Sequence, residues 1–209
     1  MITVEMKEWT GIILAGGLSS RMGSNKALLP LDGSIVLEHV AEAIAPAVSR
    51  IIVAAGPNVD AYQALDYPCV EDGYPGKGPL AGLHAALEAS ETEWNLVCAC
   101  DMPLVQPSLF TTLQRLAASD KTHPAMVPRL EGRVHPLVGI YHMDVLPSLE
   151  QCLKEGRLRV TRWLEEIGCR YVEAEDLERA GIQDAAAQLS NLNTMQDYQD
   201  LVDKRPPSM

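Results

Sequence analysis

The chain has 209 residues, with 17 Lys and Arg against 28 Asp and Glu, so the formal net charge is 17 − 28 = −11. A protein this acidic lacks the basic surface with which nucleic-acid binders contact phosphates, which argues against a nucleic-acid partner. Its 47% of hydrophobic and 22% of charged residues are typical of a globular protein with a buried core. The length favours one domain.

The N-terminal segment and the cysteines predict a cytoplasmic protein. Residues 1–8 mix acidic and basic side chains and lack the apolar stretch of a secretion signal. No apolar run approaches the ~18 residues that would span a bilayer, so no membrane partner is expected. The five cysteines are odd in number and irregularly spaced, which predicts reduced thiols. Cys98 and Cys100 are interpreted as small core residues of a strand.

In the first half of the chain, short apolar runs alternate with helical patterns. The apolar runs at residues 11–15 and 50–55, rich in β-branched residues, predict buried strands, and further strands are expected at residues 68–71 and 95–100. Between the first two strands we expect a helix capped by Ser34 and stopped by Pro46. A second helix is expected at residues 80–89, and Pro107 suits the first turn of a third.

The second half is less regular. The patterns predict strands at residues 125–128, 136–141 and 170–174, and helices at residues 144–154 and 160–167. Thr194 and Asp197 match a capping box that opens a final helix. With no repeat or linker, we expect one α/β domain over residues 1–204 with a mostly parallel central sheet. Residues 205–209 are expected to form a flexible tail.

A glycine-rich segment follows the first predicted strand. Gly16 and Gly17 allow a sharp turn whose backbone N–H groups can bind anions. Arg21 can contact phosphate oxygens with its planar guanidinium group, and Lys26 adds a mobile charge. The Walker pattern fails here because Lys26 does not follow a glycine, and the dinucleotide fingerprint Gly-x-Gly-x-x-Gly is also absent.

The whole segment, Leu-Ala-Gly-Gly-x-Ser-x-Arg-Met-Gly-x-x-Lys from Leu14 to Lys26, resembles the signature loop of nucleotidyltransferases with a GT-A-like Rossmann fold. It is most similar to the MobA family of molybdenum cofactor guanylyltransferases. The resemblance implies a three-layer Rossmann-like fold and a loop that wraps a nucleoside triphosphate. Residues 14–17, Leu14, Ala15, Gly16 and Gly17, would contact base and phosphates through the backbone, while Arg21 and Lys26 would hold triphosphate oxygens.

Asp101 is the first residue past a predicted buried strand. Ligands of open α/β sheets bind at the carboxyl ends of the strands, and Mg²⁺ often takes only one or two protein carboxylates there. Taken alone, this residue could equally be a capping Asp in a turn. The segment Val-Cys-Ala-Cys-Asp-Met-Pro, which contains it, also resembles a second MobA motif, whose aspartate coordinates the metal ion.

A third stretch of interest runs from Asp72 through a Gly/Pro-rich loop. Glycine and proline there let a nucleotide approach the main chain closely. Asp72 matches a family position associated with the nucleotide, and the segment that begins at Gly78 resembles a third signature. Without the resemblance, Asp72 is simply a solvated turn residue.

Acceptor-binding residues are expected in the second half of the chain. His135 begins a segment that resembles the acceptor-side strand of the family, although a structural role is more common for such a histidine. Arg157, Arg159 and Arg162 form a basic cluster that could hold a phosphate-bearing acceptor or be a solvated helix end. Asn193 lies in Asn-Leu-Asn-Thr-Met, which is similar to a closing motif Asn-x-Asn-Thr-Pro.

The resemblance implies a Mg²⁺-dependent enzyme that transfers GMP from GTP to the phosphate of molybdopterin and releases pyrophosphate. Residues 1–107 would bind the nucleotide and residues 108–204 the acceptor. Proteins that make or receive the molybdenum cofactor are expected partners. Two alternatives stay open: the same chemistry with CTP or another phosphorylated acceptor, and a nucleotide-binding regulatory protein without turnover.

Overall fold

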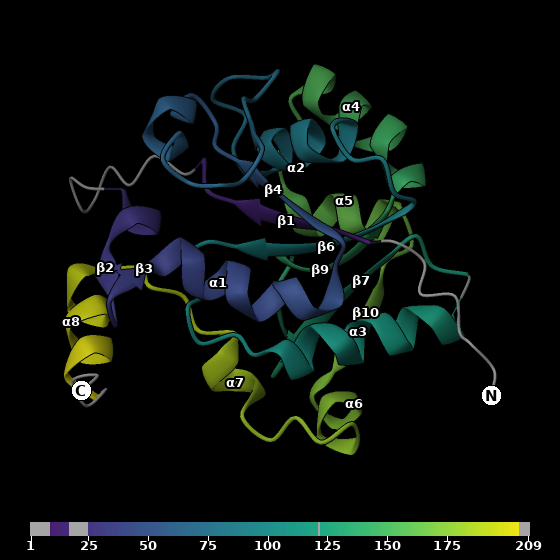
Figure 1. Ribbon diagram of the computed structural model, residues 1–209. Coiled ribbons are helices and arrows are strands. Elements are labelled where there is room, and N and C mark those ends of the chain that lie inside the picture. The colour runs from purple at the N-terminus through teal and green to yellow at the C-terminus, as the bar shows by residue number, and fades with distance from the viewer. Residues whose placement is uncertain (1–8, 17–24, 121, 205–209) are drawn as a thin grey trace.

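The computed structural model describes residues 9–16, 25–120 and 122–204. A central sheet carries helices on both faces (Figure 1). Its strands lie in the order β10-β7-β9-β6-β1-β4-β5, and β8 pairs with β7. Their bounds are Thr10–Leu14 (β1), Arg50–Ala54 (β4), Cys69–Val70 (β5), Trp94–Ala99 (β6), Ala125–Leu130 (β7), Arg133–Val134 (β8), Val138–His142 (β9) and Arg170–Glu173 (β10).

The sheet is mostly parallel, as expected. β1 pairs in parallel with β4 and β6, β4 with β5, and β10 with β7, whereas β9 runs antiparallel to both β6 and β7. The short β8 also runs antiparallel to its neighbour β7. Every residue of β1 is buried, which explains why this strand reads as a continuous apolar run with no polar alternation.

Two helical layers cover the sheet, and each has its own apolar core. α1 (Val36–Ile44) and α3 (Pro107–Ser119) pack on one face, where Ile13, Val53 and Phe110 are buried together. α2 (Pro79–Glu88), α4 (Leu146–Glu155) and α5 (Val160–Glu166) pack on the other. This three-layer arrangement confirms the predicted fold class (Figure 1). Among the described residues, no helix is both long and apolar enough to cross a bilayer.

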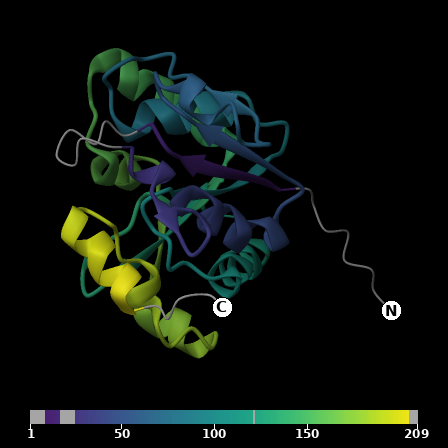
Figure 2. The ribbon, with the colours of Figure 1, turned by 60° about the vertical axis from the view of Figure 1, so that its left-hand side comes forward.

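The remaining elements are short. β2 (Pro30–Leu31) and β3 (Ser34–Ile35) form a hairpin, and α8 (Met195–Lys204) lies beside it (Figure 2). Leu31, Val36, Leu192 and Leu201 are buried in a small core there. The other short elements are α6 (Ala174–Arg179), α7 (Ala185–Gln188) and four 3₁₀ turns, η1 (Lys26–Leu28), η2 (Ala45–Ala47), η3 (Val59–Tyr62) and η4 (Met143–Val145).

Several local predictions need correction. Ser34 does not cap α1: it pairs in the β2–β3 hairpin, and its hydroxyl donates to Glu38. The strand expected at residues 68–71 shortens to β5, and the helix expected from residue 144 begins at Leu146, after η4. By contrast, Pro107 does open α3, and Thr194 accepts from the backbone of Asp197, whose carboxylate accepts from the N–H of Thr194, as in a capping box.

The strand order places a crevice beside β1. From β1 the chain first adds β4 and β5 on one side, and then crosses to add β6 on the other side. Connections that leave neighbouring parallel strands in opposite directions open a crevice at the carboxyl ends of those strands, where ligands of such folds bind. A ligand-binding site is therefore expected at the carboxyl ends of β1 and β6.

Candidate functional site

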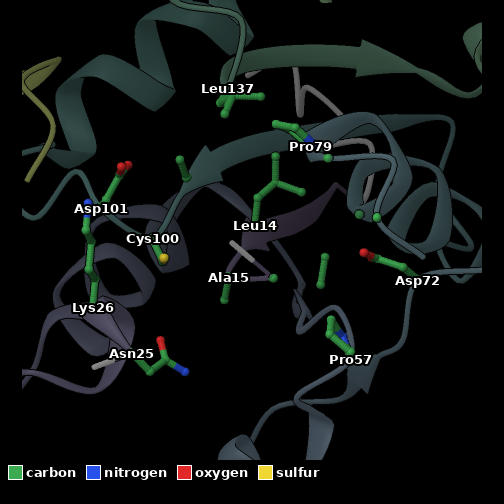
Figure 3. Close-up of a pocket in the computed structure, with 16 residues that line it drawn as sticks. Leu14, Ala15, Asn25, Lys26, Pro57, Asp72, Pro79, Cys100, Asp101 and Leu137 are labelled. Carbon is green, nitrogen blue, oxygen red and sulfur yellow. The ribbon is translucent and has the colours of Figure 1, made fainter. Parts of the chain in front are cut away.

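A cavity of about 400 Å³ lies at the carboxyl ends of β1, β4 and β6 (Figure 3). This volume is within the range of small-molecule sites. Strand ends, the first turn of α2 and the segment before η1 all contribute to its wall. The lining residues are Leu14, Ala15, Gly16, Asn25, Lys26, Ala54, Pro57, Asp72, Gly76, Gly78, Pro79, Gly82, Ala99, Cys100, Asp101 and Leu137.

Gly16, which lines the cavity, lies against the backbone of Gly56 at the adjoining strand end. A Cβ atom on Gly16 would lie 2.8 Å from the backbone nitrogen of Gly56, and one on Gly56 would lie 2.8 Å from the Cα atom of Gly16. Gly56 also has a φ of +57°, which disfavours other residues. Both positions therefore require glycine, since any side chain would push the two strand ends apart.

Lys26 begins η1, and its side chain reaches toward residues 191–193, the segment before α8 that we call the C-terminal segment. Its ammonium group donates to the backbone oxygens of Leu192, at 2.7 Å, and Asn193, at 3.0 Å. An ammonium group has three donors, so one remains for a ligand oxygen. Figure 3 shows the end of the Lys26 side chain next to the carboxylate of Asp101. The lysine thus joins η1 to residues 192 and 193, which precede α8.

Asp101 follows β6 and faces the cavity (Figure 3). Burial raises the pKa of its carboxyl group, against the opposing effects of a hydrogen bond from Asn191 and the charge of Lys26. The Asn191 amide donates to Oδ1 at 3.1 Å, and the N–H of Leu192 donates to the backbone oxygen of Asp101 at 2.8 Å. The C-terminal segment therefore holds both Asp101 and Lys26.

The donor set suits a magnesium ion that is shared with a ligand. A single carboxylate, completed by water and phosphate oxygens, is a common way in which proteins bind Mg²⁺. No group of three or more His, Cys, Asp or Glu side chains that could enclose a metal occurs in the described part of the chain. The burial cost at Asp101 means that a cation there would be stabilising. Asp101 thus fits a metal held jointly with phosphates.

Asp72 lies at the other end of the cavity, away from Asp101 and Lys26 (Figure 3). Its Oδ1 atom is buried and has no hydrogen-bond partner among the described residues. Burial, followed by the charge of Glu71, raises the pKa of its carboxyl group. A buried acceptor without a donor is costly, so this atom is suited to accept from a ligand. Gly82, on the first turns of α2, is close enough that its Cβ would contact that atom at 3.5 Å.

Most of the residues that the sequence predicts for the nucleotide meet in this one cavity. Leu14, Ala15, Gly16, Lys26, Asp72, Gly78 and Asp101 all line it. Gly17 and Arg21 lie outside the described residues. Asn193 does not line the cavity, but its backbone oxygen accepts from Lys26.

The arginine cluster does not reach the cavity. Arg157 forms ion pairs with Glu155, at 2.6 Å, and Glu166, at 2.5 Å, and Arg162 pairs with Glu166 at 3.1 Å. Two of the three charges are therefore neutralised within the helical layer, and Arg159 is exposed on the same segment. These ion pairs favour the solvated helix end over the acceptor grip, and a role of the cluster in acceptor binding stays a prediction. Sequence spacing reveals shared faces but not the acidic neighbours that occupy them.

His135 is also held away from the cavity lining. It is only 7% exposed, and its backbone N–H donates to the oxygen of Pro128 at 2.9 Å. Burial, assisted by the charge of Arg133, lowers the pKa of its imidazole, which favours the neutral form. Two residues further on, Leu137 does line the cavity, so His135 can affect the site through the position of this segment.

Three residues of the site were not singled out by sequence. Asn191 holds Asp101, and Gly56 crosses Gly16. The hydroxyl of Tyr62 contacts both Ala15 and Asn25, as described below. Gly56 could have been found, because it follows a predicted strand that ends at the same edge of the sheet. For Tyr62 the sequence offers no signal beyond a single aromatic residue in a loop.

The crevice beside β1 is where open α/β sheets bind nucleotides. Its glycine crossing, lysine and strand-end aspartate are the groups that phosphates and their cation require. The fold and the site together define an α/β protein of the nucleotidyltransferase class. A family model described as a MobA-like NTP transferase domain matches residues 11–174. The chain belongs to this MobA-like family.

Relatives and solved structures agree with this membership. Two proteins named probable molybdenum cofactor guanylyltransferase are each 34% identical over 197 residues: one from Bacillus cereus (92% of this chain, 95% of the relative) and one from Carboxydothermus hydrogenoformans (94% and 96%). The crystal structure of molybdopterin-guanine dinucleotide biosynthesis protein A from Archaeoglobus fulgidus superposes with a TM-score of 0.78 at 24% identity, covering 93% of this chain and 97% of that one. This structural likeness shows the shared fold.

Proposed function

We propose that the protein transfers GMP from GTP to the terminal phosphate of molybdopterin, with release of pyrophosphate and formation of molybdopterin guanine dinucleotide. The observation that carries the proposal is the meeting of Lys26, Asp101 and Asp72 in one cavity at the strand ends. The names of the relatives, probable molybdenum cofactor guanylyltransferases, support the choice of substrates.

The proposed reaction is a displacement at phosphorus. An oxygen of the acceptor phosphate attacks the α-phosphorus of GTP, and the bond from that phosphorus to the oxygen bridging to the β-phosphate breaks. The electron pair leaves on pyrophosphate. Because a phosphate nucleophile is already ionised near neutral pH, no general base is needed. The protein therefore contributes mainly by positioning the two substrates and neutralising charge.

Lys26 and Asp101 are proposed to act at the phosphates. Lys26 keeps one donor for a triphosphate oxygen while the C-terminal segment holds its other two. Asp101 would hold Mg²⁺, which supplies positive charge to the phosphate oxygens when it is bound. Arg21 and Gly17 are proposed to assist at the triphosphate by virtue of their place in the signature loop.

Asp72 is proposed to read the base. A guanine presents two adjacent donors, N1–H and the 2-amino group, to an acceptor carboxylate. The buried Oδ1 of Asp72 lacks such a donor, and the first turn of α2, with Gly78 and Gly82, leaves room beside it. Cytosine offers an acceptor at N3 where guanine has a donor, so the carboxylate favours GTP over CTP. The acceptor is proposed to enter on the side of Leu137 and Asn193.

The direct test is to offer GTP, CTP, ATP and UTP separately with molybdopterin and Mg²⁺ and to measure pyrophosphate release and dinucleotide formation. We expect turnover with GTP and far less with the others. Turnover with CTP alone would replace the base assignment and leave the reaction class intact. Tight binding of GTP without any product would instead indicate a nucleotide-binding regulatory protein.

A further inference from the structure

Tyr62 is a fully buried tyrosine at the end of η3, with 0% of its surface exposed. Its hydroxyl lies 3.0 Å from the backbone oxygen of Ala15 and 2.8 Å from Nδ2 of Asn25. Those two residues are separated by ten positions in the sequence, and both line the cavity. The tyrosine itself does not line the cavity, so its hydroxyl contacts the wall from behind.

The direction of these hydrogen bonds follows from counting protons. The hydroxyl has one proton, and two acceptor-only oxygens lie near it, the Ala15 carbonyl at 3.0 Å and Oδ1 of Asn25 at 3.2 Å; the proton is assigned to Ala15, because that contact is shorter and Oδ1 already accepts from a backbone N–H. The Asn25 amide then donates to the hydroxyl oxygen, while Oδ1 of Asn25 accepts from the N–H of Ala27 at 3.1 Å. Burial raises the pKa of Tyr62 to about 12, and the hydroxyl keeps its proton. One directed chain of hydrogen bonds thus runs from η1 through Tyr62 to the end of β1.

This series of hydrogen bonds fixes the position of the Lys26 backbone. Asn25 precedes Lys26 directly and caps η1 through its side chain. At the far end of the Lys26 side chain, the ammonium group is held by the backbone oxygens of Leu192 and Asn193. Lys26 is therefore held at both ends: at the backbone end, the Tyr62 hydroxyl joins Asn25 to the end of β1, and the neighbouring Ala27 packs in the core.

We propose that Tyr62 is a positioning residue for nucleotidyl transfer, whose hydroxyl sets Lys26 against the end of β1 and so places its ammonium group beside Asp101. This inference rests on the proposed function, because the proposed function supplies the triphosphate on which Lys26 acts. The ring of Tyr62 packs in the core beneath α1, a role that phenylalanine could fill. The hydroxyl has no packing role there, and without it the Ala15 oxygen and the Asn25 amide would lose their partner.

The test is Tyr62→Phe, which removes the hydroxyl and keeps the ring. In steady-state assays well below the unfolding temperature, we expect kcat/KM for GTP to fall about tenfold, since small displacements of catalytic groups are costly, while KM for the acceptor stays unchanged. Thr10→Val is the matched control. It also removes one fully buried hydroxyl, from the opposite end of β1, where Thr10 accepts from Thr92 at 2.9 Å, and it should lower stability without changing kcat/KM.

A second comparison separates positioning from a general loss of stability. In a Lys26→Ala background, Tyr62→Phe should cause no further loss of kcat/KM, because the group that it positions is gone. If the two losses multiply, or if Tyr62→Phe behaves like Thr10→Val, the inference is overturned. Should Tyr62→Phe fail to fold, Asn25→Ala breaks the same contact from the cavity side and should give the same tenfold loss; wild-type kcat/KM in that variant would also overturn the inference.

Measurements on the wild-type protein distinguish a failure of the proposed function from a failure of the role proposed for Tyr62. Binding of GTP with Mg²⁺ is measured by calorimetry before any variant is compared. If the wild type binds no nucleoside triphosphate, the proposed function fails, and the role of Tyr62 fails with it. If the wild type binds and turns over GTP while Tyr62→Phe matches it in kcat/KM, only the inference about Tyr62 fails.

Discussion

The two ends of the cavity differ in how completely their polar groups are paired. At one end, Asp101 accepts from Asn191, and Lys26 donates to two backbone oxygens. At the other end, Oδ1 of Asp72 is buried and has no hydrogen-bond partner within the described part of the chain. A paired cluster is already arranged before a ligand arrives, which suits charge neutralisation in a transition state. An acceptor that lacks a partner among the described residues can pair with a donor of the ligand, which suits selection of a base.

The largest expected effect is at the paired end. Asp101→Ala should lower kcat by about 10³-fold or more, because it removes the carboxylate proposed to hold Mg²⁺ and leaves Asn191 without its acceptor. Pyrophosphate release at saturating GTP and Mg²⁺ measures this loss. Asp144→Ala, on an exposed turn, is the control and should retain wild-type kcat. Full turnover in Asp101→Ala would remove the metal assignment.

Lys26→Ala is expected to have the next largest effect. Loss of its ammonium group should lower kcat/KM for GTP by about 10²-fold, since it removes a charge proposed to act on the triphosphate. Calorimetric titration with GTP should show weaker binding as well. The surface residue Lys154, which pairs with Glu150, provides the control as Lys154→Ala. An unchanged affinity for GTP would exclude Lys26 from the nucleotide site.

At the unpaired end, the expected change is in selectivity. Asp72→Asn replaces an acceptor by a group with both a donor and an acceptor, so discrimination between GTP and the other triphosphates should fall by about 10- to 100-fold. The ratio of kcat/KM values for GTP and CTP is the measurement. If that ratio stays at its wild-type value, the base is read elsewhere.

Asp72→Asn is also expected to have a smaller effect, on the free energy of unfolding. The raised pKa of Asp72 means that the folded state holds its proton more tightly than the unfolded state. Its burial therefore costs stability as pH rises through the folded pKa, and the cost is absent below the unfolded value near 3.9. Ligand-free Asp72→Asn should gain about 1 kcal/mol at pH 7, or about 2–4 °C in Tm. The gain should shrink as pH falls from the folded pKa toward about 4 and should be absent below that pH. A gain that does not vary with pH would contradict this account.

The smallest effect is expected far from both ends. Arg162 is exposed and pairs with Glu166, and such surface pairs contribute little. Arg162→Ala should leave KM for the acceptor within about twofold of the wild-type value. A larger rise in KM would indicate that the arginine cluster binds the acceptor.

Strand ends were the most predictable part of the site. Asp101 and Gly16 each follow a continuous apolar run, and the rule that ligands bind at the carboxyl ends of parallel strands was enough to bring them together. The contacts of the C-terminal segment were not predictable to the same degree. Asn191 and Lys26 are 165 positions apart, and nothing in their spacing indicates that both lie against Asp101. Partners at such separations depend on how the last segment packs over the sheet.

By itself, the sequence determined the class of fold and the identity of the charged groups, because apolar periodicity and strand-end position are local properties of the chain. Tertiary structure alone decided which of those groups are free to act. It neutralised Arg157 and Arg162 with glutamates, left Oδ1 of Asp72 without a partner and joined Ala15 to Asn25 through Tyr62. Whether a charge is paired or a hydroxyl is buried depends on neighbours that are distant in sequence, and only the folded chain brings those neighbours together.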